Sequence, residues 1–450
     1  MAVGIIADDL TGALDSGLQL YRKGLSVSVL FSNAESELAA GLSQVIVLDT
    51  ETRNISAGEA VQKIKKAASQ LLAHQIPLVY KKLDSTLRGN PGPEIAVILD
   101  SFDFDAAVLT PVLPVTGRTV RNGVLYVNGV PIADTEFSKD PLSPIETSDI
   151  AEIIARDTAL SGIQLDKHAL YAAKRDLHSF LETRRAKKKQ TVLIADAETN
   201  ADLRKVSRFV SHNRGKLLPC GSAGLLEHLA APRHGVSGEK RRFHFFRRLA
   251  SAFPVPRRGP AGRLSCPPVL IVSSSMSEVT RRQIEFVTER ELVVRIKPND
   301  DYIFNTDDAP EVYSEKILSA LLHGRNVLLD AGGKREELPD SRETVAGRSA
   351  VLQAFLSKVT KEVLKEISGS GLGGLAVTGG ETAITVCSGL DSRGIRICGE
   401  IEPLVPAGIL IGGRAQGLPV VTKAGGFGTD SVFKKTCDYF AKMRRSDLYS

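Results

Sequence analysis

The sequence predicts an α/β protein of two domains, each with a mostly parallel sheet, and three observations lead to that expectation. The chain has 450 residues, which is more than one hydrophobic core usually organises. Short apolar runs alternate with amphipathic stretches along almost its whole length, a pattern typical of strands that alternate with helices. A basic segment with three prolines, at 237–266, interrupts this alternation. We therefore expect domains at 1–236 and 267–450, joined by a linker.

In the first domain, short apolar runs bounded by turn residues predict buried strands, and the amphipathic runs predict helices. The expected strands lie at 3–7, 27–31, 45–48, 78–81, 106–109, 192–196 and 216–220. Helices are expected at 57–74 and 93–102. Residues 120–130 hold two short β runs with Asn-Gly pairs, which favour tight hairpin turns. A hairpin excursion from the sheet is therefore expected there.

The same alternation resumes at residue 268. Strands are expected at 269–273, 292–296, 327–330, 375–378 and 420–423, and helices at 279–290, 311–323, 348–368 and 431–444. Such an order implies a mostly parallel sheet with helices on both faces. Ligands of open parallel sheets bind beyond the carboxyl ends of the strands. The residues at those ends are therefore the candidates for chemistry in both domains.

Composition excludes several classes of protein. Hydrophobic residues make up 42% of the chain and charged residues 24%, which excludes a wholly disordered or fibrous protein. No apolar run is long enough to span a membrane, and residues 1–10 lack the basic start of a signal peptide. The five cysteines include no CxxC pair, so neither a disulfide framework nor a zinc knuckle is expected. These features predict a cytoplasmic protein.

The net charge of +6 comes from one segment, 237–266, whose eight basic residues face a single acidic one, Glu239. A solvated linker between domains is the favoured interpretation of this segment. Because Phe243, Phe245 and Phe246 lie among its cations, binding to RNA or to another acidic surface is the alternative.

Two strand ends in the first domain carry charged residues. The strand at 3–7 is followed by Asp8 and Asp9, which could bind a substrate hydroxyl, accept its proton or hold Mg²⁺ through water. Capping of the following helix is an equally good explanation for one of them. The strand at 45–48 leads to Arg53, whose guanidinium could bind a carboxylate in a fork geometry.

The strand end at 80–90 is the most informative, because it concentrates three cations, a carboxylate and two hydroxyls. Lys81, Lys82 and Arg88 could neutralise a carboxylate or phosphate, and Asp84 could accept hydrogen bonds from sugar hydroxyls. A charged turn is the simpler explanation. However, Lys81 belongs to an otherwise apolar strand, and a buried lysine requires a partner or a ligand.

Glycine- and serine-bearing loops follow three strands of the second domain, at 273–277, 378–382 and 423–430. Such loops can present backbone amides and helix N-termini to phosphate groups. Each could also be an ordinary turn. A P-loop is excluded because no GxxxxGK[ST] motif occurs. The GxGxxG match at 369–374 follows a helix and precedes a strand, the reverse of the dinucleotide-binding order, so it predicts a connector.

Taken in order, these motifs resemble those of the four-carbon acid sugar kinase family. The resemblance spans nearly the whole chain and is carried by IADDLTGA at 6–13, KKLDSTLRGN at 81–90, GSAGL at 221–225, GGET at 379–382 and GGFGTD at 425–430. It implies an N-terminal acid-sugar domain, a C-terminal nucleotide-binding domain and an active-site cleft between them. It also implies ATP-dependent phosphorylation of the terminal hydroxyl of a tetronate, such as threonate, erythronate or a 3-oxo-tetronate.

The resemblance assigns roles to individual residues. The substrate site would include Asp9, Arg53, Lys81, Lys82, Leu83 and Asp84, with Asp8 and Arg88 as neighbours. The ATP site would include Ser275, Gly379, Gly380, Glu381, Thr382 and Gly425, with Mg²⁺ across the phosphates. Asp9 and Asp84 are the expected catalytic carboxylates, and Asp9 is preferred as the base. The chain departs from the family pattern at Ser274, Met276 and Gly426.

Two other functions remain open at the level of sequence. The protein could be a kinase of another small sugar acid or polyol. It could also be a non-catalytic protein that senses a nucleotide and a sugar acid, with the basic segment reaching nucleic acid. No membrane partner is expected, nucleic acid is disfavoured, and a homo-oligomer is compatible with the sequence. The stereochemistry of the substrate depends on single hydroxyl contacts, which the sequence does not specify.

Overall fold

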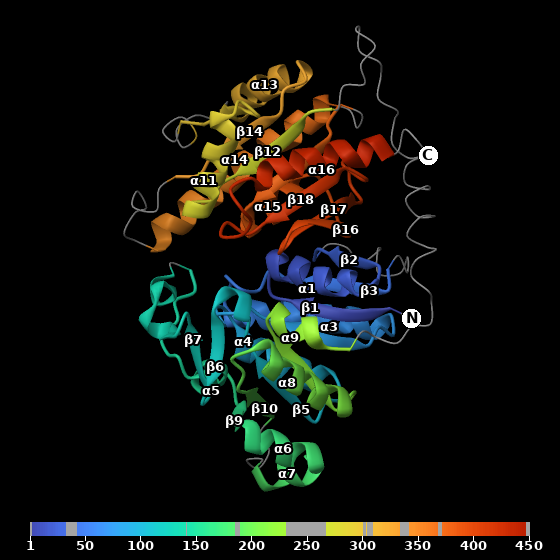
Figure 1. Cartoon of the computed structure of the whole chain (residues 1–450), viewed down its shortest axis with the longest axis vertical. Coiled ribbons are helices and arrows are strands. Elements are labelled where there is room, and N and C mark those ends of the chain that lie inside the picture. Colours follow the sequence, from blue (N-terminus) through green and yellow to red (C-terminus); the bar gives the residue numbers. More distant parts are fainter. Residues whose placement is uncertain are drawn as a thin grey trace. The chain divides into compact units, whose positions relative to one another are not determined.

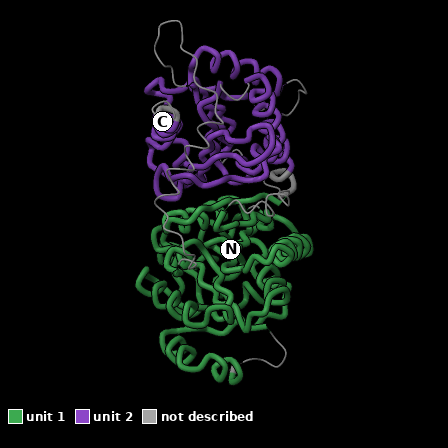
Figure 2. The backbone as a smooth tube through the Cα atoms, turned by 90° about the vertical axis from the view of Figure 1, so that its right-hand side faces the viewer, with its two compact units in different colours: residues 1–234 green, residues 235–450 purple. Residues whose placement is uncertain are grey.

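A computed structural model describes residues 2–32, 43–140, 142–184, 190–230, 267–299, 303, 309–333, 342–367 and 371–446. The chain divides into two compact units, Met1–His234 and Gly235–Ser450 (Figure 2). The basic segment predicted to link two domains, 237–266, lies outside the described residues. Each unit is an α/β structure with helices packed against a mostly parallel sheet (Figure 1), as the sequence predicts.

The first unit is built on a parallel sheet in which the strands follow the order β2-β3-β1-β4-β11-β5-β10-β9. All but β9 fall in runs that the sequence predicts. The strands are β1 (Val3–Ala7), β2 (Val27–Leu30), β3 (Val45–Asp49), β4 (Leu78–Lys82), β5 (Ala106–Thr110), β9 (Ser161–Leu165), β10 (Thr191–Ala195) and β11 (Leu217–Gly221).

The helices of this unit form two groups that pack among themselves. One group consists of α1 (Leu10–Arg22), α6 (Lys167–Arg175), α7 (Leu177–Arg184), α8 (Asn200–His212) and α9 (Ala223–His228). The other consists of α3 (Ala57–Ala73), α4 (Pro91–Ser101) and α5 (Ile150–Ala155). Crossovers between parallel strands are right-handed, so the direction of a crossover along the sheet decides which face its helix covers. The crossovers with helices of the first group run toward the β2 edge, and those of the second group run toward the β9 edge. The two groups therefore cover opposite faces.

This arrangement creates a switch point at β1. The helix that follows β1 covers one face, whereas the helices that follow its neighbours, β3 and β4, cover the other. Between strands whose helices diverge in this way, the sheet edge is left uncovered, and ligands of open α/β sheets bind there. The carboxyl ends of β1, β3 and β4 carry all the residues that the sequence predicts for the substrate site.

The excursion predicted at 120–130 is a separate small sheet of β6 (Arg118–Arg121), β7 (Val124–Val127) and β8 (Val130–Pro131). Both Asn-Gly pairs adopt positive φ angles, 54° and 74° at the first and 51° and 83° at the second, as the predicted hairpin turns require. Short 3₁₀ turns flank the sheet: η1 (Pro114–Thr116), η2 (Ile132–Asp134) and η3 (Glu136–Lys139).

The second unit has the strand order β13-β14-β12-β15-β18-β17-β16. Its strands are β12 (Val269–Ser273), β13 (Val294–Ile296), β14 (Val327–Asp330), β15 (Gly374–Thr378), β16 (Gly394–Glu402), β17 (Val405–Ile411) and β18 (Pro419–Lys423). The first five positions in this order are parallel, but β17 runs antiparallel to both β16 and β18. The sequence did not predict the β16–β17 hairpin, and β13 begins two residues later than expected.

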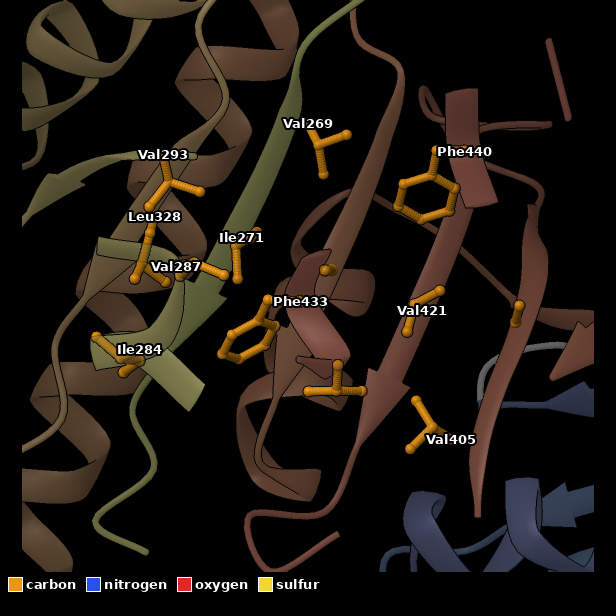
Figure 3. Close-up of a cluster of buried hydrophobic side chains, with 13 residues drawn as sticks. Val269, Ile271, Ile284, Val287, Val293, Leu328, Val405, Val421, Phe433 and Phe440 are labelled. Atoms are coloured by element: carbon orange, nitrogen blue, oxygen red, sulfur yellow. The ribbon is translucent and has the colours of Figure 1, made fainter. Parts of the chain in front are cut away.

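The helices of the second unit also cover two faces. On one face, α11 (Glu278–Glu289) packs against α16 (Val432–Ser446), and Phe433 and Phe440 of α16 belong to a core that includes Ile271 and Val421 of the sheet (Figure 3). On the other, α13 (Ala309–Leu322), α14 (Arg342–Glu366) and α15 (Gly380–Gly389) pack in sequence order. The strand β12 is therefore a second switch point, because its neighbours β14 and β15 lead to helices on the face opposite α11.

A buried ion pair ties β4 to α4 beneath the switch point of the first unit. Lys81 Nζ lies 2.6 Å from a carboxylate oxygen of Glu94, and both side chains are almost completely shielded from solvent. Lys81 also donates a hydrogen bond of 3.0 Å to the carbonyl of Lys82. Glu94 therefore supplies the partner that a lysine in this apolar strand requires.

Replacing Glu94 with leucine should destabilise the first unit by about 3–5 kcal/mol, because the Lys81 ammonium would be left buried without its counter-charge. The loss can be measured by hydrogen exchange of peptides that cover β1 and β4. Lys205→Met is the control, since it breaks only the exposed pair with Asp202 and should cost less than about 1 kcal/mol. Equal exchange in the two variants would contradict the prediction.

Candidate functional site

Asp8 and Asp9 follow β1 directly, and the sequence left open which of them caps the next helix and which faces a ligand. Asp9 is the N-cap of α1, where its Oδ1 accepts a hydrogen bond of 2.8 Å from the amide of Gly12. Asp8 is buried beside the end of β3, and its backbone carbonyl accepts hydrogen bonds from the amides of Thr52 and Arg53. Both carboxylates nevertheless lie at the same switch point, because Arg53 contacts both of them.

Arg53 is the centre of the charged cluster. Its Nε and Nη2 lie 2.9 Å and 2.8 Å from the same oxygen, Oδ2 of Asp8, so the two nitrogens share one acceptor. The same Nη2 lies 2.7 Å from Oδ1 of Asp9 and 3.8 Å from Oδ1 of Asp84. One guanidinium therefore joins three carboxylates from the ends of two strands.

Lys82 lies on the other side of Asp8. Its Nζ is 4.0 Å from Oδ1 of Asp8 and donates a hydrogen bond of 2.7 Å to the carbonyl of Leu83. The contribution of Leu83 to the cluster is thus made by its backbone, because its side chain is buried. Lys82 also lies against the first turn of α1, where a β-carbon on Gly12 would collide with the ammonium. Gly12 therefore leaves the space that Lys82 occupies.

Asp84 and Arg88 extend the cluster toward the excursion that follows β5. Arg88 Nε donates a hydrogen bond of 2.7 Å to Oδ2 of Asp84, and its Nη1 lies 2.8 Å from Oδ2 of Asp140. The hydroxyl of Thr86 donates to the same oxygen of Asp84. Two arginines lie over the ring of Phe137, Arg88 at 5.4 Å and Arg118 at 5.5 Å from its centroid.

Arg118 is a residue that the sequence analysis missed. It begins β6 and donates a hydrogen bond to the carbonyl of Thr116, while its Nε is buried without a hydrogen-bond partner. Burial lowers the pKa of its guanidinium, and no carboxylate among the described residues forms an ion pair with it. No sequence signal pointed to it, because Arg118 lies in the excursion after β5, whose placement beside the charged strand ends depends on the tertiary fold.

The three carboxylates bound by Arg53 differ in proton affinity. Burial alone would raise the pKa of Asp8, but Arg53 and Lys82 hold it below its ordinary value. Burial would likewise raise the pKa of Asp84, which Arg53 and Arg88 instead keep well below the usual range. For Asp9, burial together with the charge of Asp8 outweighs Arg53, and its pKa is raised. Asp9 thus binds a proton most readily of the three.

Three further acidic groups near α1 were not predicted as site residues. Burial raises the pKa of Asp15 to about 7 against the opposing effect of Lys82, and it raises that of Glu51 to about 7 with help from Asp9. Burial and the neighbouring Glu51 raise the pKa of Asp49 well above its usual value. Glu51 Oε1 accepts a hydrogen bond of 2.9 Å from the amide of Leu10, so this carboxyl group supports the start of α1.

In the second unit, the residues predicted for the ATP site come together at the β12 switch point. The hydroxyl of Ser274 forms a hydrogen bond with that of Thr382. Gly425 packs so closely on Ser275 that a β-carbon there would collide with the serine hydroxyl. Gly379 adopts a φ of 103°, which favours glycine, and starts α15 without a side-chain cap. The amides at the start of α15 therefore lie beside the two serines.

Glu381 lies at the edge of this group. Both of its carboxylate oxygens are 3.3 Å from the hydroxyl of Ser349 on α14, and its side chain is exposed. The loop after Gly425 is held from the other side by Glu402 at the end of β16. Oε2 of Glu402 accepts a hydrogen bond of 2.6 Å from the amide of Thr429, and Oε1 accepts one of 2.6 Å from its hydroxyl. The unpredicted hairpin therefore anchors the glycine-rich loop.

Lys423, the last residue of β18, was assigned to a strand but given no role by the sequence analysis. Its side chain is buried, and its Nζ donates hydrogen bonds to the hydroxyls of Thr378 (2.9 Å) and Thr280 (3.1 Å) and to the carbonyl of Gly425 (3.2 Å). Burial lowers its pKa to about 7. The signal that could have revealed it is the one used for Lys81, a lysine within an apolar strand.

The described residues contain no group of three or more His, Cys, Asp and Glu side chains that could hold a metal ion. No helix of the described part of the chain has the length and apolar character needed to cross a bilayer.

Two family models match the chain, one in each unit. Residues 3–229 match a sugar-binding N-terminal domain, and residues 270–433 match a nucleotide-binding C-terminal domain. The crystal structure of Haemophilus influenzae protein HI1011, of the family DUF1537, has a similar fold. It is 22% identical with a TM-score of 0.68, and the match covers 97% of this chain and 100% of that one.

Curated relatives match over almost the full length. A D-threonate kinase from Salmonella typhimurium is 31% identical, and the match covers 99% of this chain and 100% of the relative. A D-erythronate kinase from Heliobacterium modesticaldum is 28% identical, with 99% of each chain covered. With a charged site in the sugar-binding half and a hydroxyl- and glycine-rich site in the nucleotide-binding half, the chain belongs to the four-carbon acid sugar kinase family.

Proposed function

We propose that the protein uses ATP to phosphorylate the terminal, 4-hydroxyl group of a tetronate or 3-oxo-tetronate in carbohydrate catabolism in the cytoplasm. The observation that carries the proposal is the cluster at the β1 switch point, where Arg53 holds the carboxylates of Asp8, Asp9 and Asp84 together beside Lys82. Such a cluster offers acceptors for several hydroxyl groups and cations for an acid group within one small region. A short polyhydroxylated acid requires both.

The carboxylate of the substrate would bind to the cations whose charge is least neutralised within the fold. Lys81 is paired with Glu94, and Arg88 is paired with Asp84 and Asp140. Lys82 has only the more distant contact with Asp8, at 4.0 Å, and Arg118 has no ion pair among the described residues. We assign the acid group to these two cations. The hydroxyl groups would then be bound by Asp9 and Asp84.

Asp9 would accept the proton of the reacting hydroxyl group. Its pKa is raised by burial and by Asp8, whereas the pKa values of Asp8 and Asp84 are both lowered. A carboxylate with the higher proton affinity is the better general base at neutral pH. Arg53 would keep Asp9 oriented and would balance the charge of Asp8 and Asp84 while the proton moves. Asp84 would mainly orient the substrate.

ATP would bind at the β12 switch point through loop amides and hydroxyls. The amides at the start of α15, together with Ser275, Thr382 and Gly425, form a surface that can approach phosphate oxygens closely. Mg²⁺ commonly binds through substrate phosphates and water rather than through a protein cage, so it would enter with the nucleotide and neutralise phosphate charge. Phosphoryl transfer depends chiefly on positioning and charge neutralisation.

The direct test is ADP release from Mg·ATP by the purified protein with D-threonate, D-erythronate, their L-isomers and 3-oxo-tetronates. We expect turnover with one member of this panel and a product phosphorylated at O4, identified by ³¹P NMR. Turnover with only another small sugar acid would correct the substrate class. Absence of transfer to any acid sugar, with nucleotide and acid sugar both bound, would replace the kinase assignment with a sensing role.

Asp9→Asn tests the assignment of the base. Asparagine keeps an oxygen that can accept the hydrogen bond from Gly12, so α1 should remain capped while proton acceptance is lost. We expect kcat to fall by about 10²–10⁴-fold, the range typical of removing a general base, with the Kd for Mg·ATP unchanged. Asp438→Asn, on the exposed face of α16, is the control for a lost carboxylate. Wild-type kcat in Asp9→Asn would refute the role.

A further inference from the structure

Lys423 is a buried cation whose charge is not matched by any described carboxylate. Its side chain is 5% exposed, and its three hydrogen bonds go to two hydroxyl groups and one carbonyl. The ring of Phe433, 5.8 Å from Nζ, closes another side. A buried ammonium with only neutral partners is unstable relative to one in water unless a negative charge approaches it. Lys81, also buried in the first unit, has Glu94 for this purpose.

The contacts of Lys423 indicate which ligand could supply that negative charge. Its ammonium bonds Thr378 at the end of β15, Thr280 in the first turn of α11 and Gly425 in the loop after β18. Its own carbonyl accepts a hydrogen bond of 2.9 Å from the amide of Gly379. Lys423 thus joins the three loops that carry the residues assigned to the ATP site, and it lies directly beneath them.

We propose that Lys423 supplies the buried positive charge that the phosphates of a bound nucleotide neutralise, and that nucleotide binding fixes a proton on its amino group. This inference rests on the proposed function and adds to it a residue and a coupled proton. The charge acts through the low-dielectric interior, where electrostatic interactions are strong over several ångströms, so Lys423 can keep its bonds to the loops. It therefore stabilises bound phosphate and sets the geometry of the loops together.

The sign of the pH dependence follows from the free and bound states. Without nucleotide, burial lowers the pKa of Lys423 to about 7, and no described charged group of β15, β17, α11, α15, α16 or the loop after β18, Glu381 of α15 included, offsets this effect. A bound phosphate raises that pKa. Below pH 7 the lysine is already charged and binding takes up no proton. Above pH 7 the amino group of Lys423 is mostly neutral in the free protein. Nucleotide binding then takes up close to one proton, and the affinity falls as the pH rises.

Isothermal titration calorimetry of the full chain with Mg·ATP, in two buffers of different ionisation enthalpy, measures this proton. We expect uptake of about one proton per site at pH 8.5 and little at pH 6. The Kd should rise by up to about tenfold per pH unit above pH 7, the limit for a single coupled proton. Absence of proton uptake at pH 8.5 by a wild-type protein that binds Mg·ATP would overturn the inference.

Substitution assigns the proton to Lys423. Lys423→Met, an unbranched apolar side chain one atom shorter and without charge, should weaken Mg·ATP binding by about tenfold or more at pH 6.5 and abolish proton uptake at pH 8.5. Its affinity for adenosine, measured by ligand-detected NMR, should not change, because adenosine has no phosphate. Lys423→Arg keeps a permanent charge and should bind Mg·ATP without proton uptake. Lys434→Met, on the exposed face of α16, is the matched control.

The outcomes separate this inference from the proposed function. Wild-type affinity and proton uptake in Lys423→Met would overturn the role of Lys423 and leave the kinase assignment intact. Loss of both, in a protein that transfers phosphate to no acid sugar, would support the role of Lys423 and refute the proposed reaction. A wild-type protein that binds no nucleotide would overturn both. Unchanged adenosine binding and circular dichroism in Lys423→Met exclude misfolding as the cause of a loss.

Discussion

A parallel sheet is open to ligands where neighbouring strands send their helices to opposite faces, and each unit places its candidate site at such a strand. In the first unit that strand is β1, and in the second it is β12. This topology brings the candidate site residues together. Asp8, Asp9 and Arg53 lie around the end of the first strand, and Ser275 and Gly379 lie around the end of the second. The hydrophobic cores serve to hold these strand ends in register.

The two sites differ in how far their charged side chains neutralise one another. The first contains nearly balanced charges, because Arg53, Lys82 and Arg88 face Asp8, Asp9, Asp84 and Asp140. The interior of that unit is balanced as well, by Lys81 and Glu94. The second site has hydroxyls, amides and one buried lysine without a carboxylate. A weakly charged acid sugar suits the first arrangement, and a polyanion suits the second.

Much of the fold could be predicted from the sequence because most strands are buried on both faces and read as short apolar runs. The strands β9 and β16 were missed because many of their residues remain partly exposed, and SGIQL and GIRICGEIE contain polar residues within the strand. Their partner β17 was missed although all its residues are buried. The helix α14 begins at Arg342, earlier than the expected 348, since its polar first turns lack the apolar periodicity on which the prediction depended.

The sequence predicted which residues form the candidate site, but not which charged side chains pair with one another. Asp8, Asp9, Arg53 and the residues from Lys81 to Arg88 were all identified from strand ends, yet the sequence does not reveal that Glu94 neutralises Lys81. Glu94 reads as an ordinary residue in the first turn of a helix, and only the packing of α4 beneath β4 brings it to the lysine. Arg118 was missed for the same reason, whereas Lys423 carried a signal that was not used, a lysine within an apolar strand.

The contact between Gly12 and Lys82 has a consequence for engineering this protein. Glycine within a helix is a standard target for stabilisation, since alanine there commonly adds up to about 1 kcal/mol through its helix propensity. At Gly12 the new methyl group would collide with the Lys82 ammonium and with the Asp9 carboxylate. Thermostability screens that rank substitutions by propensity alone would therefore select, at this position, a change that displaces Lys82 and Asp9 within the charged cluster.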